Sequence, residues 1–264
     1  MRIMKIKKAF MLISLNAFFL ILGLIISAAV FVPLRMRMKS KAWLAMLWAR
    51  HSCYILGIHI DCTGSYQKDN AYLIVSNHCS YLDILVLAGV MPSVFVAKKE
   101  ISAWFIFGRL AKLAGTIFID RASKASTISV IGEIRKRMEH GVNVVFFPEG
   151  TTNDGKAVKE FKSALFKVPV EIRCPILPVS LSYSYSEGMP VNETNKIAWY
   201  GDMKFLPHLW KLLGLKRIIS KIHFNPAISC VRTLERSRAR KLLSGYAHES
   251  ILTGLEHLRG ESGS

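Results

Sequence analysis

The segment from Ala9 to Val32 constrains this chain more than any other part of its sequence. All 24 of its residues are uncharged, and four small or polar residues are the only interruptions of its apolar character. A helix needs about 20 apolar residues to cross the hydrocarbon core of a bilayer, whereas the apolar core of a signal peptide has about 7 to 15. The segment is therefore predicted to be a retained, membrane-associated helix that ends at Pro33.

Basic side chains flank this segment on both sides. Residues 1–60 contain nine Lys or Arg and no Asp or Glu, which is half of the net charge of +18. Cationic flanks beside an apolar helix favour contact with anionic lipid headgroups. Because the positive-inside rule would place both flanks in the cytoplasm, it does not fix the topology.

A second apolar stretch runs from Ala42 to Ile58 and carries Arg50 and His51 near its centre. Two helices with basic ends on one side fit a hairpin that dips into a single leaflet, and one span with a cytoplasmic domain fits nearly as well. For the segment Ala9–Val32, a buried core helix is the less expected alternative. We interpret residues 1–60 as membrane-associated helices and residues 61–264 as an α/β domain.

The excess of basic residues predicts an anionic partner. Hydrophobic residues make up 51% of the chain, which is a high share for a soluble domain. The sequence contains no zinc-finger, homeodomain or RNP-like pattern. We therefore expect membrane lipids, and not nucleic acid, to be the partner.

The five cysteines are odd in number and form no C-x-x-C pair. This pattern is typical of free thiols in a reducing compartment. Cys79 follows His78 directly, which raises the question of a nucleophile. Small buried thiols are far more common than catalytic ones, so Cys79 is interpreted as a packing residue.

Short apolar runs alternate with helical stretches after Asp61, which favours an α/β domain with a largely parallel sheet flanked by helices. The expected strands are Ile58–Thr63, Ala71–Ser76, Val94–Ala97, Thr116–Asp120, Asn143–Phe147 and Ile176–Ser182. The expected helices are Leu82–Val90, Trp104–Leu113, Ser126–His140, Ser163–Lys167, a core-packing stretch over Phe205–Ile218 and an amphipathic one over Thr233–Leu258. In such a sheet, chemistry is expected at the carboxyl ends of the strands.

His78 follows one of these strands, and Asp83 falls in the first turn of the next helix. A neutral imidazole that a carboxylate holds on one ring nitrogen can act through the other as a general base on a hydroxyl. An Asp at a helix start also stabilises the helix by itself. The pair alone leaves both interpretations open and favours the structural one.

Two further motifs end strands in polar residues. The turn Pro148-Glu149-Gly150 could hold an anion or a ligand hydroxyl, and Arg121, which follows Asp120, suits a forked grip on phosphate. The ordinary alternatives are a Pro-Gly turn and a surface ion pair. No metal-ligand spacing, P-loop or G-x-G-x-x-G occurs, and the missing G-x-S-x-G elbow argues against a serine esterase.

Taken together, these stretches resemble the glycerolipid acyltransferase family, whose best-known members convert lysophosphatidic acid to phosphatidic acid. "NHCSYLD" is similar to the N-H-x-S-x-x-D block of the family, "GTIFIDR" to the second block, "FPEGT" to the third and "ILPVS" to the fourth. The four blocks stand in the right order over residues 76–180.

The resemblance implies transfer of an acyl chain from acyl carrier protein or coenzyme A to a lysolipid hydroxyl, with no cofactor beyond this thioester co-substrate and no metal. It implies that His78 is the general base and that Asp83 orients it, without an acyl-enzyme. The acceptor-binding residues that it implies are Arg121, Glu149, Gly150, Thr151 and, more weakly, Lys98. The structural residues of the motifs that it implies are Asn77, Ser80, Pro148 and Pro178.

One position departs from the phosphatidate-forming members, in which an Arg commonly follows E-G-T, whereas this chain has Thr152. The continuation "NDGKAVKEFKSALF" is more similar to members that acylate other lysolipids, including lyso-ornithine lipids. Lysophosphatidic acid stays the first expected acceptor because Arg121 is present, and a lyso-ornithine lipid is the alternative. A non-catalytic lipid-binding membrane adaptor is the alternative of another class. The expected location is a bacterial-type inner membrane, with the catalytic domain facing the cytoplasm.

Overall fold

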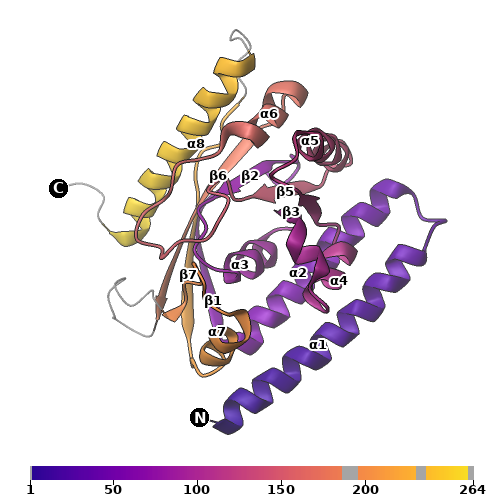
Figure 1. The fold of residues 1–264 in the computed structure, drawn as a ribbon, viewed down its shortest axis with the longest axis vertical. Helices are drawn as coiled ribbons and strands as arrows, with labels where there is room; N and C mark the ends of the chain where they lie inside the picture. Colours follow the sequence, from indigo (N-terminus) through magenta and orange to yellow (C-terminus); the bar gives the residue numbers. More distant parts are fainter. Residues whose placement is uncertain (1, 186–195, 230–235, 261–264) are drawn as a thin grey trace.

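One sheet forms the centre of the protein. The computed structural model describes residues 2–185, 196–229 and 236–260. Within these residues, seven strands lie in the order β1-β7-β6-β2-β5-β3-β4 (Figure 1). The strands are β1 (Ile58–Gly64), β2 (Leu73–Ser76), β3 (Ser93–Lys98), β4 (Ile117–Ile119), β5 (Asn143–Phe146), β6 (Ile176–Tyr185) and β7 (Ile218–Phe224). All neighbouring pairs are parallel except β6 with β7, so the prediction of a largely parallel sheet is confirmed.

Helices cover both faces of the sheet. The α-helices are α1 (Arg2–Ala28), α2 (Leu34–Leu56), α3 (Leu82–Val90), α4 (Phe107–Leu113), α5 (Lys124–Glu139), α6 (Lys167–Ile172), α7 (Phe205–Leu212) and α8 (Arg236–Arg259), and the 3-10 helices are η1 (Lys99–Ala103) and η2 (Ser163–Phe166). Helices α2, α3 and α7 pack on one face, and α5, α6 and α8 pack on the other (Figure 1). The inner strands are apolar on both sides, since Ile74 of β2 faces the first group while Leu73 and Val75 face the second.

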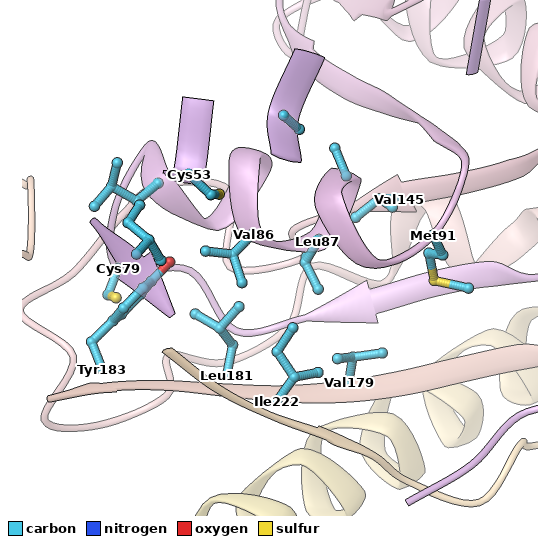
Figure 2. Close-up of a cluster of buried hydrophobic side chains, with 14 of the residues drawn as sticks. Cys53, Cys79, Val86, Leu87, Met91, Val145, Val179, Leu181, Tyr183 and Ile222 are labelled. Carbon is cyan, nitrogen blue, oxygen red and sulfur yellow. The ribbon is translucent and has the colours of Figure 1, made fainter. Parts of the chain in front are cut away.

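Helix α3 is fixed to the sheet by a buried apolar cluster. Figure 2 shows this cluster, which extends from Cys79 and Tyr183 at one end to Met91 at the other. Val86 and Leu87 of α3 are fully buried in it. Because α3 cannot shift relative to β2 and β6 without opening this cluster, its first turn keeps a fixed position at the carboxyl end of β2.

Helix α1 lies along α2 and α4 (Figure 1). The Lys8 ammonium donates hydrogen bonds to the carbonyl oxygens of Leu56 (3.1 Å) and Leu215 (2.9 Å). Further along, the Trp48 indole donates to Asn16 at 2.9 Å. Within the described residues, α1 is the one helix long and apolar enough to cross a membrane, and 11% of its most apolar window is buried. Its outward face is therefore consistent with membrane association.

Strand β7 is not among the predicted strands, although the sequence contains its signal. The run "IISKIHF" alternates between buried and less buried positions, as a strand with one covered face does. The helix expected over Phe205–Ile218 ends at Leu212, and β7 begins at Ile218. Strand β7 lies between β1 and β6 and is antiparallel to β6. The sheet therefore has one strand more than predicted and contains one antiparallel pair.

The cysteines that the structure describes as free thiols agree with the expectation. Cys53 and Cys79 are buried free thiols, and Cys62 is an exposed one. Cys230 lies outside the described residues. Helix α2 ends at Leu56, and the predicted division between residues 60 and 61 falls inside β1.

Helix α8 supports β6 from the face opposite α3. The Ser180 hydroxyl of β6 donates to the Ile251 carbonyl at 2.9 Å and accepts from the Asn225 amide at 3.0 Å. Gly254 lies against the same two polar side chains, and a Cβ atom there would be 2.3 Å from Ser180 Oγ and 2.6 Å from Asn225 Oδ1. A side chain at this position would therefore separate α8 from β6.

We expect Gly254→Ala to lower the free energy of unfolding by about 1 to 3 kcal/mol, because a methyl group overfills this contact. Gly245 of the same helix is the matched control, since nothing lies within 4 Å of an added Cβ. Gly245→Ala should raise stability by about 0.8 to 1 kcal/mol through helix propensity. Urea unfolding in detergent measures both, and equal changes would contradict the described packing of α8.

Candidate active site

The loop after β2 brings His78 and Asp83 together. Strand β2 ends at Ser76, and α3 begins at Leu82. His78 Nδ1 and Asp83 Oδ2 are 2.7 Å apart, and the Asp83 side chain is 0% exposed, compared with 15% for His78. A carboxylate accepts the N–H of the neutral ring, so Nδ1 carries the proton and Nε2 keeps its lone pair. This is the geometry that a general base requires.

Four nitrogen and oxygen donors hold the Asp83 carboxylate. Besides the His78 ring, the backbone N–H groups of Cys79 (2.8 Å) and Ser80 (3.0 Å) donate to Oδ2. The Tyr183 hydroxyl from β6 donates to Oδ1 at 2.8 Å. Burial and the neighbouring Asp83 carboxylate raise the pKa of Tyr183 well above its ordinary value, so this hydroxyl remains a donor. These contacts fix the orientation of the carboxylate and, through it, of the imidazole.

The turn after β5 also positions His78. The imidazole stacks on Phe147, with ring centroids 3.9 Å apart and planes 10° from parallel. The backbone N–H of His78 donates to Glu149 Oε1 at 2.7 Å, and its carbonyl accepts from the backbone N–H of Asn153 at 3.1 Å. The first and third motifs therefore form one unit, because β2 and β5 are neighbours in the sheet.

Glu149 is a buried organiser of this unit. Its side chain also accepts hydrogen bonds from the Asn153 amide and from the backbone N–H of Lys159 at 3.0 Å. Burial raises the pKa of its carboxyl, while the bonds from Lys159, His78 and Asn153 act in the opposite direction. At 3% exposure, the carboxylate joins three loop segments. This positioning role differs from the acceptor-binding role that the family resemblance implies.

Cationic side chains gather around Gly150. The Arg121 guanidinium donates to the Gly150 carbonyl, which joins the second motif to the third. Gly150 has a φ of +76°, which favours glycine, and a Cβ there would lie 3.2 Å from both Arg121 Nη1 and Lys162 Nζ. Burial lowers the pKa of Lys98, and the charges of Arg121 and Lys162 act in the same direction against the opposite effect of Glu100. Three cations thus share the space beside this turn.

Lys162 is not among the predicted site residues. It follows the third motif by a long loop, and its backbone N–H donates to the Pro148 carbonyl at 2.9 Å. This bond returns the loop to the turn after β5. The one sequence signal is a basic residue just before η2, which no local pattern distinguishes from other surface lysines.

The remaining motif residues shape the strand ends. The Asn77 side chain donates to the Leu181 carbonyl (2.8 Å) and accepts from the Leu181 N–H (2.9 Å), which joins the end of β2 to β6. The buried Ser80 hydroxyl accepts from the Leu82 N–H at 3.4 Å, at the start of α3. Thr151 is exposed, and within the described part of the chain its side chain makes no hydrogen bond.

Pro178 lies inside β6, where a proline cannot donate to a neighbouring strand. The β6–β7 ladder begins only at Val179, so no partner on that side requires its missing N–H. Its carbonyl accepts from the Asn225 backbone N–H at 3.1 Å. Pro178 therefore pairs with β2 and lies just before the part of β6 that pairs with β7.

Cys79 has the properties of a packing residue. Its thiol is 3% exposed and lies 3.8 Å from Asp83 Oδ1. Burial, followed by the charges of Asp83 and Glu149, raises the pKa of this thiol well above its ordinary value. A thiol that stays protonated is a poor nucleophile.

Among the described residues, no group of three His, Cys, Asp or Glu side chains is placed to hold a metal.

An aromatic wall adjoins the His78 loop at Tyr81. The Tyr81 ring contacts Trp199, Phe205 and His208, with centroids 4.9 to 5.7 Å apart. The Trp199 backbone N–H donates to the Cys79 carbonyl at 2.8 Å, which attaches this wall to the His78 loop. The exposed apolar side chains next to it are Phe105 and Leu206, at 75% and 71% exposure.

Fold and site together define an acyltransferase. Residues 59–182 match the model of a family described as Acyltransferase. The chain is also 33% identical over 236 residues to the lyso-ornithine lipid O-acyltransferase of Rhizobium meliloti, an alignment that covers 86% of this chain and 80% of that protein. The chain therefore belongs to the acyltransferase family, which confirms the resemblance drawn from the four sequence blocks.

A second relative has a different acceptor in its name, and a solved structure has the same fold. The 1-acyl-sn-glycerol-3-phosphate acyltransferase of Neisseria gonorrhoeae is 32% identical, over 70% of this chain and 69% of that protein. The crystal structure of the 1-acyl-sn-glycerophosphate acyltransferase from Thermotoga maritima superposes with a TM-score of 0.68 at 18% identity, covering 99% of this chain and 100% of that one. The latter likeness confirms the fold.

We expect His78→Ala to lower turnover by about 10²- to 10⁴-fold, because the acceptor hydroxyl loses its general base. The adjacent Cys79→Ala is the matched control and should keep most of the turnover, since the buried thiol makes only a long, weak contact with Asp83. Initial rates with a labelled acyl donor measure both variants. Thermal unfolding must first show that each variant is folded.

The opposite ranking would contradict this assignment. A Cys79→Ala enzyme that is folded and inactive, beside a His78→Ala enzyme with wild-type turnover, would point to a thiol nucleophile. An acyl-enzyme trapped on Cys79 by rapid quenching would have the same meaning.

Proposed function

We propose that this protein transfers an acyl chain from an acyl carrier protein or coenzyme A thioester to the free hydroxyl of lysophosphatidic acid. The observation that carries the choice of acceptor is the group of Lys98, Arg121 and Lys162 beside Gly150. A phosphate monoester has a charge of about −1.5 to −2 near neutral pH and offers several acceptor oxygens. Three cations at one turn are complementary to that group.

Lys162 supplies the charge that the sequence lacks at Thr152. Phosphatidate-forming members commonly have an Arg after E-G-T, and this chain does not. The Lys162 ammonium lies at the same turn, because its backbone is bonded to the Pro148 carbonyl. The departure at Thr152 is therefore compatible with a phosphorylated acceptor.

A lyso-ornithine lipid is the second candidate acceptor. The relative from Rhizobium meliloti has that activity in its name and covers more of this chain than the relative from Neisseria gonorrhoeae. An ornithine headgroup offers a carboxylate to the three cations, but it also brings an ammonium that they would repel. This repulsion favours lysophosphatidic acid.

The chemistry that we infer starts at His78 Nε2. This nitrogen takes the proton of the acceptor hydroxyl while the hydroxyl oxygen attacks the thioester carbonyl carbon. Asp83 stabilises the imidazolium that forms, and Tyr183 holds Asp83 in place. Collapse of the tetrahedral intermediate breaks the C–S bond, and His78 returns its proton to the leaving sulfur. The products are an ester and a free thiol, with no acyl-enzyme and no cofactor beyond the thioester.

We infer further that α1 and α2 rest as a hairpin in the cytoplasmic leaflet of a bacterial inner membrane, with the α/β domain in the cytoplasm. The contact of Lys8 with the Leu215 carbonyl holds α1 alongside the domain, and that of Asn16 with Trp48 holds it alongside α2. A helix that crosses the bilayer alone would lose these contacts. The outward face of α1 exposes Phe10 (70%) and Phe18 (59%). Phe105 and Leu206 beside the aromatic wall offer apolar surface for the approach of a lipid.

We expect Lys162→Ala to raise the KM for lysophosphatidic acid by about 10-fold or more, because a charge-assisted contact with the phosphate is lost. The KM for a lyso-ornithine lipid should not rise by a similar factor. Lys156→Ala is the control, since Lys156 is an exposed lysine in the same loop with Asp154 as its neighbour. Initial rates against both acceptors measure the change.

The acceptor choice fails if membranes that contain the protein acylate lyso-ornithine lipid and leave lysophosphatidic acid unchanged. The assigned role of Lys162 fails separately if lysophosphatidic acid is acylated with the same KM by the Lys162→Ala and wild-type enzymes.

The hairpin predicts that the start of α1 and the loop after β1 lie on one side of the membrane. In a background with Cys62 and Cys230 replaced by Ser, Arg2→Cys and Lys68→Cys should react with an impermeant thiol reagent from the same side of sealed vesicles. Labelling from opposite sides would establish a single span instead. Inverted and right-side-out vesicles provide the two measurements.

A further inference from the structure

A hollow with cationic walls lies at the amino ends of β3, β4 and β5, whereas His78 follows the carboxyl end of β2. The hollow has a volume of about 400 Å³ and is bounded by the first turns of α2 and the ends of α4 and α5. Gly115 and Thr116, which precede β4, and Val142, which precedes β5, also line it. His78 follows the carboxyl end of β2, so the parallel sheet separates this hollow from the catalytic group.

The walls of the hollow carry an excess of positive charge. Arg37 and Lys41 come from α2, Lys112 from α4 and Arg137 from α5. Arg137 is paired with Glu133 and also donates to the Gly115 carbonyl at 3.4 Å. The other three cations have no ion pair within the described residues.

These charges repel one another in a partly dehydrated place. Burial lowers the pKa of Lys41, and the charges of Arg37 and Arg137 add to this effect. Like charges that share a site raise its free energy unless an opposite charge enters. An anion in the hollow would remove this repulsion and receive donors from three helices at once.

The rest of the hollow is apolar. Leu34 and Met38 of α2 form one side, and Val94 of β3 and Phe118 of β4 form another. Next to it, the turn between α1 and α2 exposes Phe31 at 98%. The ligand that fits has an anionic group joined to apolar parts and can approach from a lipid surface.

We propose that this hollow is a second phosphate-binding site, separate from the acceptor site, and that its ligand is the headgroup of an anionic phospholipid. Phosphate of a soluble metabolite has the same charge, but it leaves the apolar side of the hollow without a partner. A bound lipid would connect α2 of the hairpin to α4 and α5 of the catalytic domain.

The test compares thermal unfolding of the full chain in a neutral detergent with three added probes. These are short-chain phosphatidylglycerol, short-chain phosphatidylcholine and inorganic phosphate. We expect phosphatidylglycerol to raise the unfolding temperature by at least about 4 °C at saturation and phosphatidylcholine to have no such effect. The shift should be lost in Lys41→Gln/Lys112→Gln, and it should persist in Lys68→Gln/Lys136→Gln, which removes the same charge from exposed positions outside the hollow.

Other results would overturn the proposal. An equal shift in both double variants, or no shift in the wild type, would exclude a phosphate site here. If inorganic phosphate reproduces the shift and the cavity variant loses it, the site stays but the lipid assignment is wrong.

The Lys41→Gln/Lys112→Gln variant should be folded, because it removes repulsion between the cations of the hollow and leaves its apolar side chains in place. Its unfolding temperature without ligand should equal or exceed that of the wild type. If the double variant unfolds at a lower temperature than the wild type, the single substitution Arg37→Gln is tested in its place. This substitution removes one charge from the wall of the hollow, at a half-buried position. A phosphatidylglycerol shift that Arg37→Gln leaves intact would count against the site.

Discussion

One buried carboxylate, that of Asp83, is the constraint on which the site and much of the fold depend. A buried carboxylate that loses its partners costs about 3 to 5 kcal/mol. Its donors come from the His78 loop and from Tyr183 of β6, which is 100 residues further along the chain. The loop, the first turn of α3 and strand β6 must therefore stay assembled for the carboxylate to be satisfied. Asn77 strengthens the same connection by bonding both backbone groups of Leu181.

The charges at the site divide according to burial. The carboxylates of Asp83 and Glu149 are buried at 0% and 3% exposure, and their bonds go to protein donors. The cations Lys98, Arg121 and Lys162 are exposed at the rim. Interior carboxylates thus give the site its shape, while the rim cations keep the N–H donors that the proposed acceptor would use. This division explains how a strongly basic chain forms an ordered centre around acidic side chains.

Local sequence patterns predict the local parts of this structure and not the parts that long-range packing assembles. The alternation of apolar runs and helical stretches gives the α/β class, and the block around His78 gives the paired imidazole and carboxylate, because those residues are five positions apart. Tyr183 and Lys162 are different, since nothing in their own neighbourhoods indicates that the fold brings them to Asp83 and Gly150. Strand β7 has a readable alternation, but its place between β1 and β6 follows only from the complete sheet.

The contacts of α1 have a consequence for the way the enzyme meets its lipid. A domain on a flexible linker would search a volume of solvent above the bilayer. Here Lys8 and Asn16 tie α1 to the body of the protein, so anchor and catalytic centre move together. If α1 rests in a leaflet as we propose, His78 is held at one depth and one tilt relative to that leaflet. Diffusion and protrusion of the acceptor lipid, rather than motion of the domain, would then bring the hydroxyl to the imidazole.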